Sequence, residues 1–308
     1  MTTPLRIAYR GSRSLTVLAG LMTGLLLVCV AGLVVDDRTV LGQPTWLKPA
    51  KFALSFAIYA LTLAWLLDHL RRARRLARWT ANVVAVAALL EVAAIAVQGA
   101  RGRASHFNST TWLDEQVWRS MGVSIAVLWF GTLILAILIW RDGMPDRART
   151  WSVRLGLLLL LAGLLEGGLM IPPTDEQVAL DDSGVDTLLG AHSVGVADGG
   201  PGLPLLGWST TGGDLRVGHF VGVHSLQAML IVAILVTWLV RDAERRTRLV
   251  IVAGAAYAGL FALVTWQALR GQPITQPDRT TMIVFCVLVA ASAIGAALAW
   301  LHPAPVAG

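Results

Sequence analysis

The chain has 308 residues, of which 56% are hydrophobic and only 14% are charged. Soluble domains average about 45–50% apolar and about 25% charged residues, so this composition excludes an ordinary soluble protein. The formal net charge is +6 at pH 7, but the basic residues lie mainly between apolar runs. This distribution indicates membrane topology and argues against nucleic-acid binding.

The apolar residues form eight runs of about 20 residues, each long enough to cross a hydrocarbon core of about 30 Å as a helix. In chain order the predicted spans are 15–35, 50–68, 81–99, 120–140, 152–172, 217–240, 248–269 and 280–301. The sequence therefore predicts an all-α integral membrane protein with eight transmembrane helices.

The distribution of basic residues predicts the orientation of these spans. Segments on one side carry 16 of the 25 Lys and Arg residues, and segments on the other side carry 9 together with 12 of the 19 acids. Because positively charged loops stay in the cytoplasm, both termini are expected inside. The Ala- and Arg-rich composition is typical of a high-GC bacterium, so we expect a multi-pass protein of the bacterial inner (cytoplasmic) membrane.

Four short matches in chain order indicate an internal duplication. The sequence at 98–102 (QGARG) matches 267–271 (QALRG), and 47–52 (LKPAKF) matches 215–220 (LRVGHF). Two weaker matches relate the first span to the fifth and the fourth span to the eighth. Four-span units joined head to tail share one orientation, which predicts parallel repeats forming two four-helix bundles. The domains are then 1–150 and 151–308.

The second half has a long connection at 173–216 that the first half lacks. A connection of this length is usually functional or disordered. Its Gly-Gly-Pro-Gly at 199–202 and Thr-Thr-Gly-Gly at 210–213 favour a turned, compact lid over a helix. We expect this lid to lie on the extracytoplasmic side.

Ionisable residues within the spans are the candidate catalytic groups. Glu91, Glu166 and His224 lie at similar depths, about 9–12 Å from the outer helix ends. Such residues are costly in a membrane and usually face a bundle interior, a partner or water. Together with His219 they could form acid–base pairs that exchange protons. The structural alternative is a set of Glu–His or Glu–Arg pairs that hold helices together.

The duplication also preserves cationic and amide side chains at the outer helix ends. It relates Lys48 to Arg216, Lys51 to His219, Gln98 to Gln267 and Arg101 to Arg270. Clustered Arg and Lys with amides suit a phosphate or carboxylate, so these residues and the nearby His106 are the predicted ligand-binding set. The alternative is contact with lipid headgroups by snorkelling side chains.

The histidines leave the cofactor open. His219 and His224 are five residues apart, about 140° around a helix, and the HxxxH spacing of helical zinc sites is absent, so no metal site is predicted. A zinc site would need His106 as a further ligand. The leading cofactor is a b-type haem held by His224 with His219 or His106, in a redox protein that could use a quinone.

Transport is a third function to weigh, because membrane transporters often contain repeats. Discontinuous helices in transporters require Gly- or Pro-interrupted spans at matching positions in the two halves, and the sequence shows no such pair. Transport therefore receives less weight than the other two functions.

Four strings resemble a family of uncharacterised bacterial multi-pass membrane proteins. They are WLKPAKFALS at 46–55, QGARGRASHFN at 98–108, DGGPGLP at 198–204 and GWSTTGGDLRVGHFVGVH at 207–224. The resemblance spans most of the chain and implies that these outer motifs occur together, but it supplies no activity.

The sequence thus predicts an outward-facing polar site that binds, and could process or move, an anionic amphiphile such as a lipid or lipid-linked phosphate. The expected partners are membrane lipids and this amphiphile or a quinone. The oligomeric state is left open.

Overall fold

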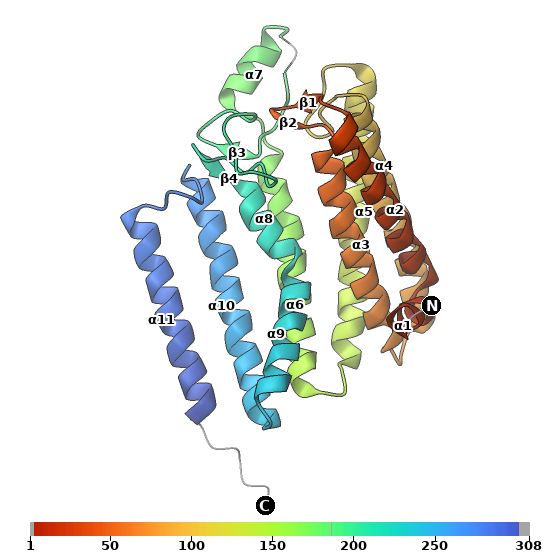
Figure 1. The fold of residues 1–308 in the computed structure, drawn as a ribbon, viewed down its shortest axis with the longest axis vertical. Coiled ribbons are helices and arrows are strands. Elements are labelled where there is room, and N and C mark those ends of the chain that lie inside the picture. Colours follow the sequence, from red (N-terminus) through yellow and green to blue (C-terminus); the bar gives the residue numbers. More distant parts are fainter. Residues whose placement is uncertain (1–2, 186, 302–308) are drawn as a thin grey trace, which may run out of the picture.

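The computed structural model describes residues 3–185 and 187–301. It consists mainly of helices (Figure 1). In chain order these are α1 (Thr3–Gly11), α2 (Arg13–Val35), α3 (Leu47–Asp68), α4 (Arg74–Ala100), α5 (Trp112–Asp142), α6 (Arg147–Glu166) with a short 3-10 helix (Gly167–Met170), α7 (Asp175–Asp182), α8 (Leu215–Val223), α9 (Ser225–Leu239), α10 (Ala243–Leu269) and α11 (Arg279–Leu301).

Seven helices in the described part of the chain are long and apolar enough to cross a membrane: α2, α3, α4, α5, α6 with its 3-10 extension, α10 and α11. They coincide with seven of the eight predicted spans, so the prediction of a helical membrane protein is confirmed. The remaining predicted span, 217–240, is divided between α8 and α9, which are bent by 51°. Counting the bent pair as one span gives eight.

The break between α8 and α9 divides the single helix predicted at 217–240. It falls at His224, where the backbone adopts φ −96° and ψ 4°. Two contacts hold α8 at its angle. A Cβ on Gly163 of α6 would lie 2.5 Å from the Cα atom of Gly222, so the backbones meet where neither residue has a side chain. The Tyr257 hydroxyl of α10 donates to the Val221 carbonyl at 2.7 Å, a group near the end of α8.

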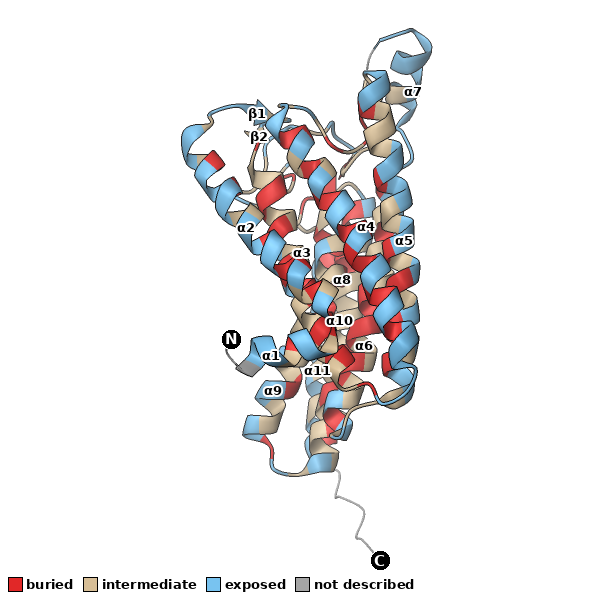
Figure 2. Cartoon of the chain, turned by 90° about the vertical axis from the view of Figure 1, so that its right-hand side faces the viewer, coloured by how far each residue is buried: buried red, intermediate tan, exposed pale blue. Residues whose placement is uncertain are grey.

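The helices form two groups (Figure 1). In the first, α2 packs on α3 and α4 packs on α5; in the second, α8 and α9 pack on α6, and α10 packs on α11. The groups meet along α5 and α6, where one hydrophobic core contains residues of both, such as Val84 and Leu160. Apolar residues outside this core remain exposed along the outer faces of the helices (Figure 2), as expected for surfaces in contact with lipid.

The connections divide between two ends of the molecule. One end, here called the loop end, carries the connections 36–46, 101–111, 171–214 and 270–278 (Figure 1). The opposite end carries α1 and the short connections 69–73, 143–146 and 240–242; it is called the arginine-rich end because 16 of the 25 Lys and Arg residues lie in or beside these segments.

Two small sheets order the loop end. Strand β1 (Thr39–Val40) pairs with β2 (Gln43–Pro44), and β3 (Ser193–Val194) pairs with β4 (Gly213–Asp214); both pairs are antiparallel. The predicted lid is turned over most of its length, but α7 shows that one part is helical. Its start has a capping box, in which the Thr174 hydroxyl accepts from the Gln177 N–H and the Gln177 side chain accepts from the Thr174 N–H.

Candidate functional site at the loop end

Lys48 and Lys51 of α3 point into the junction between the two helix groups. The Lys48 Nζ atom lies 3.2 Å from Nδ1 of His106, and the Lys51 Nζ atom donates to the Leu206 carbonyl at 3.0 Å. Both lysines are half-buried. Within the described part of the chain, no carboxylate lies within ion-pair distance of either ammonium group. The side-chain nitrogen atoms of both lysines are therefore held here by neutral acceptors.

His106 completes one side of this junction. An ammonium group can only donate, so the Nδ1 atom of His106 accepts from Lys48 and also lies 3.0 Å from the Ser105 hydroxyl. The ring packs between Phe52 and Trp118, with centroid distances of 6.0 and 5.5 Å. Burial lowers the pKa of His106 well below its ordinary value, and the neighbouring Lys48 lowers it further. His106 is therefore neutral near pH 7.

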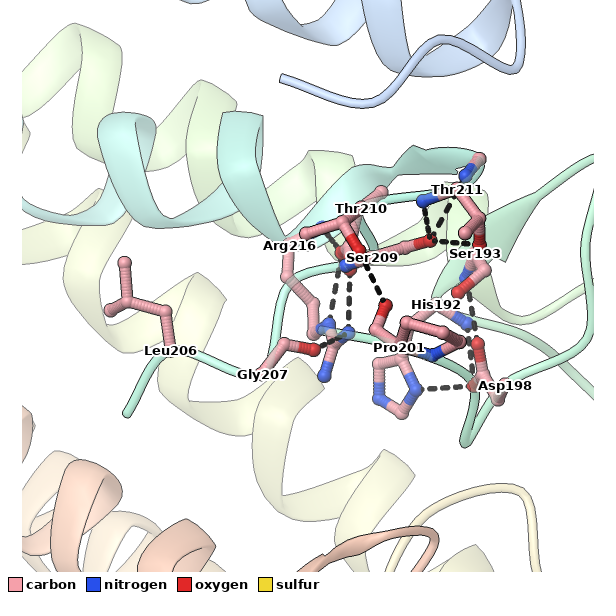
Figure 3. Close-up of polar contacts among 12 residues, drawn as sticks. His192, Ser193, Asp198, Pro201, Leu206, Gly207, Ser209, Thr210, Thr211 and Arg216 are labelled. Carbon is pink, nitrogen blue, oxygen red and sulfur yellow. Dashed lines mark hydrogen bonds and ion pairs between the residues drawn. The ribbon is translucent and has the colours of Figure 1, made fainter. Parts of the chain in front are cut away.

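The 171–214 segment contributes a histidine–aspartate pair (Figure 3). The Nδ1–H group of His192 donates to Asp198 at 2.6 Å, and the same carboxylate accepts the backbone N–H groups of His192 and Ser193 at 3.0 and 2.8 Å. Burial lowers the pKa of His192 despite this acceptor. Burial acts to raise the pKa of Asp198, but its hydrogen bonds outweigh that effect and hold the pKa below its ordinary value. The pair therefore combines an ionised carboxylate with a neutral imidazole.

Arg216 lies beside this pair at the start of α8 (Figure 3). Its Nε–H donates to the Asp214 carboxylate at 2.9 Å, and another N–H donates to the Gly207 carbonyl at 2.6 Å. The Asp214 side chain is completely buried. Arg216 thus ties α8 to the loop that precedes it, and its charge is balanced by a carboxylate of the same chain.

His219 faces α6 from the next turn of α8. Its Nδ1–H group donates to the Gly163 carbonyl at 2.8 Å, which leaves the Nε2 lone pair available. Glu166, one helical turn along α6, accepts from the Thr265 hydroxyl at 2.9 Å. Its other carboxylate oxygen is buried without a hydrogen bond in the described structure. His219 therefore contacts α6 one turn away from Glu166, but the two side chains are not hydrogen-bonded to each other in the described structure.

Polar side chains also bridge α3 and the bent span below the lysines. The Ser55 hydroxyl lies 3.2 Å from Nε2 of His224, and Gln227 donates to the Thr62 hydroxyl at 3.3 Å. From Lys48 to Thr62, α3 advances about 21 Å. A line of polar contacts thus follows the junction of the two helix groups from the loop end toward the middle of the span.

Glu91 of α4 is the most isolated of the predicted site residues. It is 1% exposed, and neither carboxylate oxygen has a hydrogen-bond partner in the described structure. Lys48 lies close enough to Glu91 for the two side chains to interact electrostatically, although they form no ion pair. Buried polar groups are normally hydrogen-bonded. Glu91 is an exception, which makes it a candidate for a functional role or for contact with a bound molecule.

Two other predicted pairs form separate networks away from the lysines. Gln98 and Arg101 both donate to Asp114, at 2.9 and 2.8 Å, and Arg101 also contacts the Gln98 side chain. Arg270 donates to Asp278 at 2.6 Å, and Gln267 donates to the Pro273 carbonyl at 2.8 Å. Each arginine is paired with an aspartate, Asp114 in the first turn of α5 and Asp278 in the connection 270–278.

The structure therefore brings together only part of the predicted site. The residues that meet at the junction include Lys48, Lys51, His106, Arg216, His219 and His224. His192 and Asp198 join them but were not among the predicted site residues. The available signal was a histidine followed six positions later by an aspartate in a Gly-rich turn. In the described structure, no three His, Cys, Asp or Glu side chains are arranged to hold a metal ion.

Fold and site together define a helical membrane protein with a basic, histidine-containing junction at its loop end. Comparisons with protein-family models, with curated proteins and with solved structures returned no match. Because function resides in sites rather than in folds, it has to be inferred from the chemistry of this junction.

Proposed function

We propose that the junction binds the anionic headgroup of an amphiphile such as a lipid or a lipid-linked phosphate. The observation that carries this proposal is the state of the two lysines. Lys48 and Lys51 are held by a neutral imidazole and a carbonyl, whereas Arg101, Arg216 and Arg270 are each paired with an aspartate. The side-chain nitrogen atoms of the two lysines therefore have no acidic partner in the described structure, which leaves them to donate to a phosphate or carboxylate.

The surroundings favour an amphiphile over a small free anion. Phe52 lies beside Lys51 on α3, and the ring of Phe220 on α8 is 45% exposed next to Trp208 of the 171–214 segment. An apolar chain could contact these rings while the headgroup meets the lysines. The 171–214 segment would then cover the headgroup through Leu206.

Chemistry on the bound molecule would fall to the His192–Asp198 pair. An ionised aspartate that fixes Nδ1 of a neutral histidine leaves Nε2 able to accept a proton, which is the requirement for a general base. This pair replaces the combinations first expected, in which His219 or His224 exchanges protons with Glu91 or Glu166. Assays of turnover and of transbilayer movement of the same probe distinguish binding alone from processing and from transport.

The test is a binding titration with dioleoyl phosphatidic acid and, in parallel, with inorganic phosphate. K48Q and K51Q should each weaken binding of the lipid roughly tenfold or more, since a hydrogen bond to a charged group contributes about 1.5–3 kcal/mol. R279Q is the matched control, because Arg279 is exposed at the loop end and forms no ion pair with another described residue. Equal binding by all three variants would refute the proposal, and tight binding of phosphate alone would replace the amphiphile with a free anion.

The finer topology is also proposed. An eight-span count with α8 and α9 as one span places both ends of the chain on one side, and the basic loops predict that this side is cytoplasmic. Parallel duplication is supported by the similar packing in the two groups, where the first helix packs on the second and the third on the fourth. On this proposal the loop end faces outward from a bacterial inner membrane.

A b-type haem is the second candidate function, and His219 is the observation that favours it. A ligating histidine usually donates its other ring nitrogen to a carbonyl or carboxylate, as His219 does to Gly163. His106 fits less well because its Nδ1 accepts from Lys48, which places the proton on Nε2. An absorption spectrum before and after dithionite tests this candidate: a Soret band with a sharp reduced α-band supports it, and a featureless spectrum rejects it.

A further inference from the structure

A second site lies between α5 and α6, toward the arginine-rich end. The two helices enclose a groove of about 310 Å³. Its lining residues are Leu133, Ala136, Ile137, Trp140, Arg141, Leu157, Leu158 and Leu161. One end is near Trp129, whose indole N–H donates across to the Leu161 carbonyl at 3.2 Å and ties the helices together. The lining is apolar except at the other end, where Arg141 precedes Asp142, the last residue of α5.

That other end has the character of a membrane interface. Arg141 is exposed, and the Arg154 guanidinium lies 5.1 Å from the centre of the Trp140 ring while it donates to the Trp140 carbonyl at 2.9 Å. Tryptophan and arginine together are typical of the headgroup level of a bilayer. The surrounding end of the molecule carries 16 of the 25 basic residues, so its field attracts anions.

We propose that this groove binds one acyl chain of an anionic phospholipid, whose phosphodiester group contacts Arg141. From Arg141 to Leu133 α5 advances about 12 Å, which sets the length of chain that the groove can bury. An acyl chain matches the apolar lining, and a phosphodiester complements the arginine at the end. This site is at the opposite end of the helices from the lysine junction, and it does not depend on the function proposed there.

The test is native mass spectrometry of the full chain with dioleoyl phosphatidylglycerol and dioleoyl phosphatidylcholine. The wild-type protein should retain one phosphatidylglycerol with about fivefold preference, since a basic residue near the surface contributes about 1 kcal/mol toward an anionic lipid. R141Q should remove this preference. R149Q is the matched control, because Arg149 is an exposed arginine at the same end that does not line the groove.

A second variant tests the groove itself. L158W places a larger ring in the groove from a position that is 57% exposed, so folding should be preserved while retention of both lipids falls. Equal effects of R141Q and R149Q would overturn the proposal, because they would show a general surface charge. Unchanged retention in L158W, or a dimer that L158W dissociates, would also overturn it.

Discussion

The Nδ1 atom of His192 lies 2.6 Å from a carboxylate oxygen of Asp198, and that carboxylate also accepts two backbone N–H groups. One ionised group therefore fixes both the histidine and the turn that follows β3. Because the turn belongs to the segment that covers Lys51, the protonation of this pair should affect how the segment closes over the junction.

The first prediction concerns pH. The pKa values of His106 and His192 are lowered in the folded chain, so below about pH 6.5 the unfolded chain binds more protons than the folded chain. The stability of the folded chain therefore decreases as the pH is lowered. The contribution of Asp198, whose pKa is also lowered, is lost only below about pH 4. Limited proteolysis of the 171–214 segment should be slow near about pH 7.5 and faster near about pH 5.

Variants of the pair provide the control. D198N removes the ionised acceptor of three hydrogen bonds and should speed cleavage at neutral pH, with a local cost of about 1–3 kcal/mol. D181N changes an exposed carboxylate of α7 in the same segment and should leave cleavage unchanged. Cleavage that is equally fast at both pH values in the wild-type protein would contradict the assigned protonation states.

The second prediction concerns Asp114. Its side chain is completely buried and accepts from Gln98, Arg101 and Thr111, so D114N should destabilise the protein by about 1–3 kcal/mol. E115Q breaks only the exposed pair with Arg119 and should cost about 0.3–0.5 kcal/mol. Thermal unfolding in detergent compares the two variants. Similar midpoints for D114N and E115Q would show that the hydrogen bonds of Asp114 do not stabilise the protein.

The third prediction concerns the contact between α6 and the bent span. A Cβ on Gly163 would overlap the backbone of Gly222, so G163A should push α8 away and destabilise the protein by about 1–3 kcal/mol or more. G20A is the matched change, since a Cβ on Gly20 of α2 meets nothing within 4 Å. A G163A protein that unfolds at the same temperature as G20A would mean that α8 does not pack on α6 in this way.

The helices could be predicted because twenty apolar residues in a row have few alternatives in a membrane. The break at His224 could not, because it depends on the meeting of Gly163 with Gly222 and on the Tyr257 hydroxyl, which are contacts between distant parts of the chain. Composition alone predicts one continuous span at 217–240. Helix α7 had a local signal in Thr174 and Gln177, but the nearby glycines favoured a turn.

The candidate site was predicted in part for a similar reason. Residue type and position indicated the basic residues, but they did not show which of them already had an acidic partner. Asp214 is two residues from Arg216, whereas Asp114 and Asp278 reach Arg101 and Arg270 across a loop. His192 carries no such signal, because it lies outside the spans and far in sequence from the repeated basic residues, whereas His106 closely follows Arg101.

The most direct measurement is the identity and amount of lipid that copurifies with the chain, determined by mass spectrometry for R141Q protein, in which the groove between α5 and α6 no longer favours anionic lipids. An anionic amphiphile should be retained at about one molecule per chain. It should be retained when R279Q is added and lost when K48Q and K51Q are added together. Equal retention with and without the two lysines would contradict the assignment of the junction as the binding site.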